Sequence, residues 1–133
     1  MTDRINLEVA ASTRSFSTIR RVLGGLGARL GYSLDDLDDL YLGCEEVLRA
    51  ALSHEPLERL NLEVQIEPRH LRLQLGHFRS PRLRADVTTS LAGCESVDLC
   101  RLLTRTMDAV TVEDGPADAF YVVLERRHRG LRQ

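Results

Sequence analysis

The chain has 133 residues, a formal net charge of −2 and 29% charged residues, and all 18 of its cationic side chains are arginines. The absence of lysine excludes P-loop nucleotide binding, which needs a phosphate-contacting lysine, and Schiff-base chemistry, which needs a lysine amine. The length fits one domain, no apolar run approaches the roughly 20 residues of a membrane span, and the three cysteines lack the spacing of a zinc site or a disulfide framework, so we expect a cytoplasmic protein.

The first part of the chain predicts a strand followed by two helices. Apolar and polar residues alternate over Ile5–Val9, which is the pattern of a half-buried strand. Apolar residues then recur at helical spacing from Phe16 to Leu30, and Gly31 ends this helix. Ser33 can cap a second helix, whose apolar stripe runs to about His54.

Local sequence adds two expectations about these helices. Gly24, Gly25 and Gly27 lie inside the first helix, where each costs about 1 kcal/mol relative to alanine. They predict either a frayed second half or the close approach of another backbone. Asp36 follows Ser33 by three residues and is therefore expected to complete a capping box.

The second half of the chain predicts a hairpin, a long loop, one helix and two strands. Alternating residues over 61–67 and 71–75, joined by Pro68-Arg69, give a strong hairpin signal. Residues 76–95 are polar and irregular, with Pro81 and Gly93, and are expected to form a long loop that could include a helical turn. The remaining elements are a helix over about 96–107, a strand at 110–112, a turn at 114–116 and a buried strand at 120–124.

This order, β-α-α-β-β-loop-α-β-β, predicts an α+β fold. We expect a two-layer α/β sandwich with a mixed, mostly antiparallel sheet and all helices on one face. Residues 1–127 would form a single domain, and the arginine-rich residues 128–133 a disordered basic tail.

The small net charge conceals a segregation along the chain. Residues 1–32 carry a formal charge of +3, residues 33–67 carry −8, and residues 68–133 carry +3. An acidic middle between basic flanks is usually solvated surface, but it can also steer and select a charged partner.

The order of elements and two segments resemble the GHKL ATPases, and more narrowly the bacterial anti-sigma factor serine kinases. The most specific parts are the helical segment Asp39–His54 and the segment Leu102–Val110, and the pair Ile19-Arg20 matches an apolar-Arg pair on the family's first helix. The resemblance spans roughly residues 4–127 and implies a Bergerat-type nucleotide-binding fold. It also implies a protein that dimerises, sequesters an alternative sigma factor and is displaced by a STAS-domain antagonist.

The family's ATP site uses a glutamate as general base and, four residues later, an asparagine that holds Mg²⁺ against the phosphates. Here Glu46 keeps the general-base position, but the asparagine position is Ala50, which cannot bind a metal ion. The family's other nucleotide-contacting positions also lack their residue types. The aspartate-glycine loop falls on Gly76, Phe78 and Ser80, the lid glycines on Val97 and Leu99, and a glycine-threonine pair on Asp118-Ala119.

The resemblance therefore implies a non-catalytic anti-sigma factor with a degenerate ATP site, no cofactor and Glu46 as a vestigial residue. The family's sigma-contacting arginine matches Arg20, and Arg14 and Arg21 extend the same basic surface. Two alternatives stay open. One is an active serine kinase that uses ATP and magnesium to phosphorylate a STAS protein, and the other is an adaptor for a partner other than sigma.

The remaining candidate sites are weak. His54, His70 and His77 have no third ligand at metal-binding spacing, so we expect no metal site. Cys44 lies in a helical apolar stripe and is expected in the core. The basic tail lacks aromatic residues between its arginines, which argues against direct binding of nucleic acid.

Overall fold

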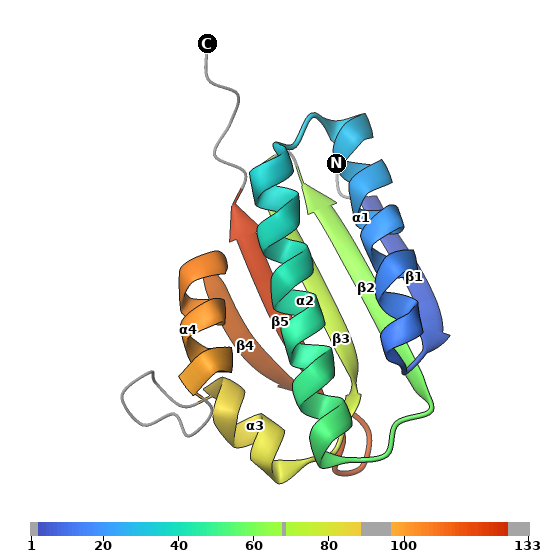
Figure 1. The fold of residues 1–133 in the computed structure, drawn as a ribbon, viewed down its shortest axis with the longest axis vertical. Coiled ribbons are helices and arrows are strands. Elements are labelled where there is room, and N and C mark those ends of the chain that lie inside the picture. Colours follow the sequence, from blue (N-terminus) through green and yellow to red (C-terminus); the bar gives the residue numbers. More distant parts are fainter. Residues whose placement is uncertain (1–2, 68, 89–96, 128–133) are drawn as a thin grey trace.

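The computed structural model describes residues 3–67, 69–88 and 97–127. Figure 1 shows their order along the chain. The elements are β1 (Asp3–Ala10), a 3-10 turn η1 (Thr13–Ser15), α1 (Phe16–Leu30), α2 (Leu34–His54), β2 (Arg59–Glu67), β3 (His70–Phe78), α3 (Pro81–Thr88), α4 (Val97–Thr106), β4 (Ala109–Asp114) and β5 (Phe120–Arg127).

The strands form one five-stranded sheet in the order β1-β2-β3-β5-β4, and every neighbouring pair is antiparallel. The α+β prediction is confirmed, but the expected mixed character is absent from these pairings. The register aligns the apolar side of each strand. One row across the whole sheet consists of Ile5, Val64, Leu73, Leu124 and Val110.

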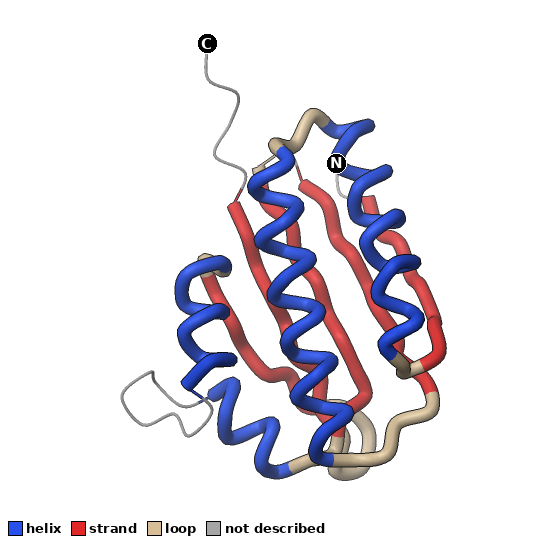
Figure 2. Tube along the Cα trace, viewed as in Figure 1, coloured by secondary structure: helices blue, strands red, loops and turns tan. Residues whose placement is uncertain are grey.

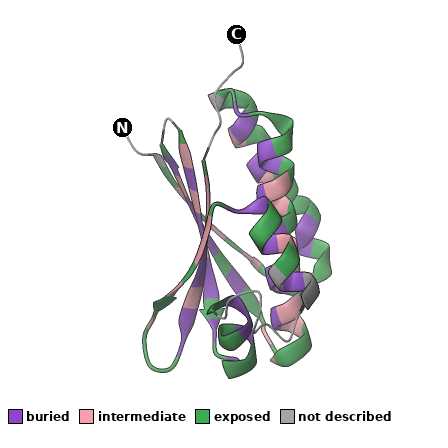
Figure 3. Cartoon of the chain, turned by 90° about the vertical axis from the view of Figure 1, so that its left-hand side faces the viewer, coloured by how far each residue is buried: buried purple, intermediate pink, exposed green. Residues whose placement is uncertain are grey.

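The helices cover one face of this sheet, as predicted (Figure 2). Seen from the side, the helices form a layer on one side of the sheet, and buried residues alternate along the strands with exposed and half-buried ones (Figure 3). This alternation is expected where one face of a sheet is packed and the other is open. The core is aliphatic, with side chains such as Leu40, Leu48, Leu73 and Leu124 fully buried. Each such side chain contributes about 2–5 kcal/mol relative to alanine.

The connection between α1 and α2 follows the sequence prediction. Gly31 has φ 75°, a left-handed conformation that ends α1 and that glycine adopts without strain. The Ser33 Oγ accepts a hydrogen bond from the Asp36 amide at 3.1 Å and so caps α2. The buried carboxylate of Asp36 also accepts hydrogen bonds from Arg126 on β5, and its expected part in a capping box stays a prediction.

The prediction of a long loop over 76–95 is wrong for most of the described residues in this range. Residues 76–78 continue β3, and Pro81–Thr88 form α3. Ser80 Oγ accepts a hydrogen bond from the Leu83 amide at 3.2 Å and caps α3, and Pro81 occupies the first helical position, where its missing N–H matters least. Residues 89–96 lie outside the described residues.

The expectation for the glycines of α1 also needs correction. The helix is continuous to Leu30, so its second half is not frayed. A Cβ on Gly27 would overlap the Leu37 side chain, so the close approach comes from a side chain of α2 and not from a backbone. Gly24 and Gly25 have open space beside them.

Among the described residues, no helix combines the length and the hydropathy needed to cross a membrane. The predicted disordered tail over 128–133 lies outside the described residues.

Candidate functional site

The positions that match the family's nucleotide site lie at one end of the sandwich. This end contains the C-terminal half of α2, the end of β3, α3 and the start of α4 (Figure 1). Contacts between α2 and α4, α2 and α3, and α3 and α4 hold these elements together. The fold therefore gathers residues that are more than 50 positions apart in the sequence.

Glu46 and Ala50 lie one helical turn apart on α2, and both are half-buried. The Ala50 side chain is a methyl group, which offers Mg²⁺ no oxygen. In the described part of the chain, no cluster of three His, Cys, Asp or Glu residues could hold a metal ion. The donor set at Glu46 and Ala50 therefore does not fit the magnesium-bound nucleotide of the family.

The end of β3 is packed against β5. Phe78 is fully buried, with its ring centroid 5.9 Å from that of Phe120. Gly76 lies under Tyr121, because a Cβ at this position would overlap the tyrosine ring. Where the family has an adenine-binding carboxylate and glycines, this chain thus has aromatic packing. Of the remaining matched positions, Leu99 and Ala119 are buried, Asp118 is exposed and the Val97 side chain lies outside the description.

The sequence reasoning missed the role of Glu55, which follows α2. Its carboxylate accepts hydrogen bonds from the backbone amides of Arg79, at 2.9 Å, and of Ser80. Because Ser80 caps α3, these hydrogen bonds connect the start of α3 to the end of α2. The sequence offers one weak signal for this role, an acidic residue beside Pro56 at the end of a helix. No sequence pattern connects Glu55 with Arg79 and Ser80, which lie about 25 positions later.

The candidate partner surface centres on Arg20, which is exposed on α1, as predicted from its place beside Ile19. The Arg20 Cζ lies 5.1 Å from the ring centroid of Tyr41 on α2. A second cation–π contact joins the same helices in the opposite direction, because the Arg49 Cζ of α2 lies 4.9 Å from the ring centroid of Phe16 on α1. Each cation–π contact of this exposed kind is worth about 0.5–1 kcal/mol.

Tyr41 and Glu45 connect these two stacked pairs. Burial, followed by a hydrogen bond to Glu45, raises the pKa of the Tyr41 hydroxyl above its ordinary value. Glu45 also forms an ion pair with Arg49 at 3.1 Å. The sequence identified Arg20 but not Tyr41, whose position beside it depends on how the two helices pack.

Arg14 and Arg21 are exposed at η1 and on α1, respectively. Among the described residues, no carboxylate forms an ion pair with Arg14, Arg20 or Arg21. These three arginines therefore leave positive charge available for an external anionic group. Their role in binding stays a prediction.

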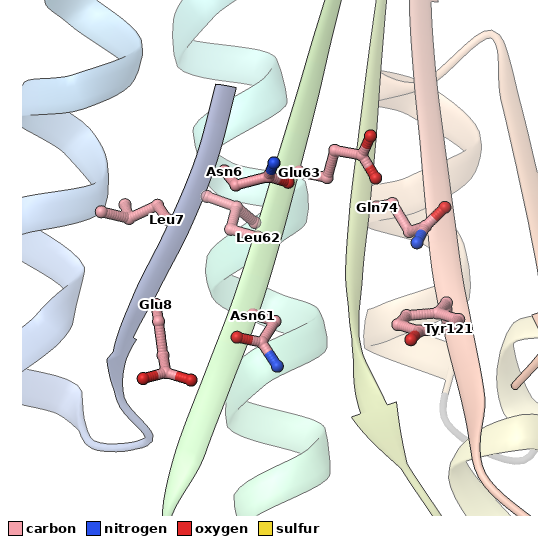
Figure 4. A pocket seen from close by; sticks show the side chains of 8 residues that line it. All are labelled: Asn6, Leu7, Glu8, Asn61, Leu62, Glu63, Gln74 and Tyr121. Carbon is pink, nitrogen blue, oxygen red and sulfur yellow. The ribbon is translucent and has the colours of Figure 1, made fainter. Parts of the chain in front are cut away.

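A concave region lies on the open face of the sheet, away from the helices (Figure 4). This groove has a volume of about 370 Å³ and is lined by Asn6, Leu7, Glu8, Asn61, Leu62, Glu63, Gln74 and Tyr121. Its two carboxylates are already paired, Glu8 with Arg59 at 2.6 Å and Glu63 with Arg4 at 2.8 Å. The groove shares no residue with the nucleotide-site positions or with the arginine surface.

Cys44 is fully buried in α2, as predicted, and burial raises the pKa of its thiol to about 12. The thiolate, which is the reactive form, is therefore suppressed at neutral pH. Two histidines also have local partners, since His70 contacts Glu125 at 3.1 Å and the His77 ring is hydrogen-bonded to Tyr121 at 2.7 Å.

Comparison with known proteins relates this chain to the serine-protein kinase RsbW of Bacillus subtilis (strain 168). The two sequences are 34% identical over 64 residues, which is 48% of this chain and 40% of that relative. The match thus takes in less than half of the curated relative's length. No family model matches the chain.

Among solved structures, the fold matches the RsbU and RsbW domains of Rv1364c from Mycobacterium tuberculosis. The TM-score is 0.66 at 15% identity, over 98% of this chain and 34% of that chain. The α+β sandwich is thereby matched by an experimental structure. The structural likeness shows the fold, and the partial sequence match relates the chain to the serine-protein kinase RsbW.

Proposed function

We propose that this chain, a homologue of the serine-protein kinase RsbW, is an anti-sigma factor that sequesters an alternative RNA polymerase sigma factor without using ATP. The observation that carries the proposal is the state of Arg20, which matches the family's sigma-contacting position. It is exposed, has no ion-pair partner among the described residues and is oriented by Tyr41. An arginine held in this way can bind a carboxylate of the partner through two parallel hydrogen bonds.

The proposal that the chain does not use ATP is supported by the missing ligands for magnesium and adenine. Mg²⁺ binds oxygen ligands, and Ala50 provides none at the position where the family has an asparagine. Gly76 offers no carboxylate to an adenine amine, and Phe78 belongs to the aromatic packing at the end of β3. Phosphoryl transfer depends on compensating the charge of the phosphates, so a site without these groups is expected to be inactive.

Replacing Arg20 by glutamate is expected to weaken sigma-factor binding by at least about tenfold, because it reverses a charge at the centre of the surface. The loss of one exposed cation–π contact should change the free energy of unfolding by less than about 1 kcal/mol. Biolayer interferometry with purified sigma factors of the source genome measures the first effect, and urea denaturation measures the second.

The matched control is Arg101→Glu, which reverses the charge of another exposed arginine, on α4. Unchanged affinity for Arg20→Glu, or an equal loss for Arg101→Glu, would contradict the assignment of the surface. If no sigma factor binds the wild-type chain, the anti-sigma proposal itself is wrong.

The active-kinase alternative is favoured by one specific observation, the retention of Glu46 at the general-base position. Isothermal titration with Mg-ATP and a phosphorylation assay on a cognate STAS protein distinguish the two functions. We expect no heat of binding at micromolar concentration, no phosphoserine, and unchanged sigma binding for Glu46→Ala. Phosphorylation that Glu46→Ala abolishes would establish the kinase instead.

The adaptor alternative is tested by the same proteins. An adaptor would be favoured by a pull-down from the source organism that recovers no sigma subunit. It should instead recover a specific partner of another class, whose binding depends on Arg20. Within the anti-sigma proposal the chain acts in the cytoplasm as a homodimer and is released by a STAS-domain protein. Sedimentation of the purified chain tests the dimer.

A further inference from the structure

The solvent-facing side of α2 exposes two leucines. Leu34 is 78% exposed and Leu42 is 42% exposed, and these are the large apolar side chains that stand out as exposed in the described part of the chain. They lie eight residues apart, which in an α-helix is about two turns and about 12 Å along one face. A single exposed leucine needs no explanation, but two on one face of the same helix form a stripe.

Unpaired carboxylates flank these leucines. Asp35 and Asp38 are exposed and Glu46 is half-buried, and we refer to these three acids together with Leu34 and Leu42 as the α2 ridge. Within the described ranges, no arginine or histidine forms an ion pair with any of the three acids. Asp35 is favoured by the positive end of the helix dipole, which acts only within the first turn. The dipole therefore explains neither Glu46 nor the leucines.

We propose that the α2 ridge binds a basic, amphipathic helical segment of a partner protein. The two leucines would pack against apolar side chains of that segment, and its arginines or lysines would pair with the acids of the ridge. A neutral apolar partner would remove Asp35 and Asp38 from water without compensation, which is unfavourable. Charge complementarity therefore selects a cationic partner.

Other occupants fit these residues less well. Nucleic acid and anionic membranes carry negative charge and would be repelled by the ridge. A metal ion needs converging ligands, and the described residues contain no such group. The ridge differs from Arg20 in the charge that it recognises, although Arg20 stacks on Tyr41, the residue before Leu42. It thus goes beyond the proposed function and does not require that the partner be a sigma factor.

A synthetic peptide tests the ridge without knowledge of the natural partner. The probe is a helix-forming peptide of about 16 residues, made of alanine, arginine and two leucines eight positions apart. Its matched control replaces both leucines by glutamine. Fluorescence anisotropy of each labelled peptide with the full chain is expected to show binding that is at least about tenfold tighter for the leucine peptide. Raising the salt from about 50 to about 300 mM should weaken this binding severalfold.

Three variants locate the binding. The double variants Leu34→Gln/Leu42→Gln and Asp35→Asn/Asp38→Asn should each lose at least about tenfold in affinity for the leucine peptide. Because these side chains are exposed and Asp35 gains only a small helix-dipole stabilisation, each melting temperature should fall by no more than about 5 °C. Glu58→Gln, which removes an exposed acid outside α2, should leave the affinity unchanged.

Several results would overturn the proposal. They are no binding by the wild-type chain, equal binding of the two peptides, or an equal loss for Glu58→Gln, which would indicate attraction to net charge alone. If the chain dimerises and Leu34→Gln/Leu42→Gln makes it monomeric, a second copy occupies the ridge and the proposal is wrong. Arg20→Glu should not weaken peptide binding, so a failure of the anti-sigma proposal and a failure of the ridge are distinguishable.

Discussion

Replacing Arg126 by methionine is expected to lower the free energy of unfolding by about 3–5 kcal/mol, because the change leaves a buried carboxylate without its counter-ion. The Arg126 side chain is 11% exposed and that of Asp36 is 6% exposed, and their ion-pair atoms lie 2.9 Å apart. The same guanidinium contacts Asp39 at 2.9 Å and donates to the Thr106 carbonyl. It therefore joins α2, α4 and β5 at one point.

Urea denaturation of the wild-type and variant chains measures this effect. The control is Arg59→Met, which removes an arginine that forms an exposed ion pair with Glu8. The Arg59 side chain is 71% exposed and that of Glu8 is 51% exposed. Such a pair contributes about 0–1 kcal/mol. A second variant that also changes Asp36 to leucine should recover part of the loss, since it removes the unpaired charge. A loss below about 1 kcal/mol for Arg126→Met would show that water reaches Asp36.

Replacing Phe78 by alanine should destabilise the chain by about 3–5 kcal/mol, which is the usual effect of removing a buried aromatic side chain. Phe78 is fully buried against Phe120, so the substitution leaves a cavity between the ends of β3 and β5. The position matters because it matches a glycine of the family's nucleotide-binding loop. A large effect would mean that the end of β3 is now part of the core.

Thermal and urea unfolding of Phe78→Ala, compared with Leu42→Ala, provides the measurement. Leu42 is 42% exposed, so its truncation should change stability by only about 0.5 kcal/mol. The Phe78 variant should also show no heat of binding with Mg-ATP, because the metal ligand is still missing at Ala50. A stable Phe78 variant that gains nucleotide binding would show that the phenylalanine only blocks an otherwise competent site.

Periodicity alone predicted most of the fold, because each strand and long helix buries one regular face. Gly31 and Ser33 also marked the junction of α1 and α2 correctly, since these residues act through their own backbone and hydroxyl. The helix α3 was missed because only Leu83 and Val87 supply an apolar face. The Ser80-Pro81 pair was the available signal, as a cap followed by a proline at the first helical position.

The candidate site was predictable to a smaller extent. The resemblance located Arg20, Glu46 and Ala50, because each lies within a local motif. The ion pair between Asp36 and Arg126 joins residues 90 positions apart, and no local pattern encodes such a pairing. The contact between Arg20 and Tyr41 likewise depends on the relative placement of two helices.

The stacking of Arg20 on Tyr41 has a consequence for the affinity that the proposed surface would have for a partner. A free arginine side chain carries about 2 kcal/mol of rotamer entropy, part of which is lost whenever it binds. Because the Tyr41 ring already restricts this guanidinium, less entropy would be lost if Arg20 binds the proposed partner, and the affinity would be higher without any new contact. A lysine at this position would bring the same charge but no planar group to lie on the ring. At residue 20, therefore, the use of arginine instead of lysine has a physical effect, because only arginine can stack a planar cation on Tyr41.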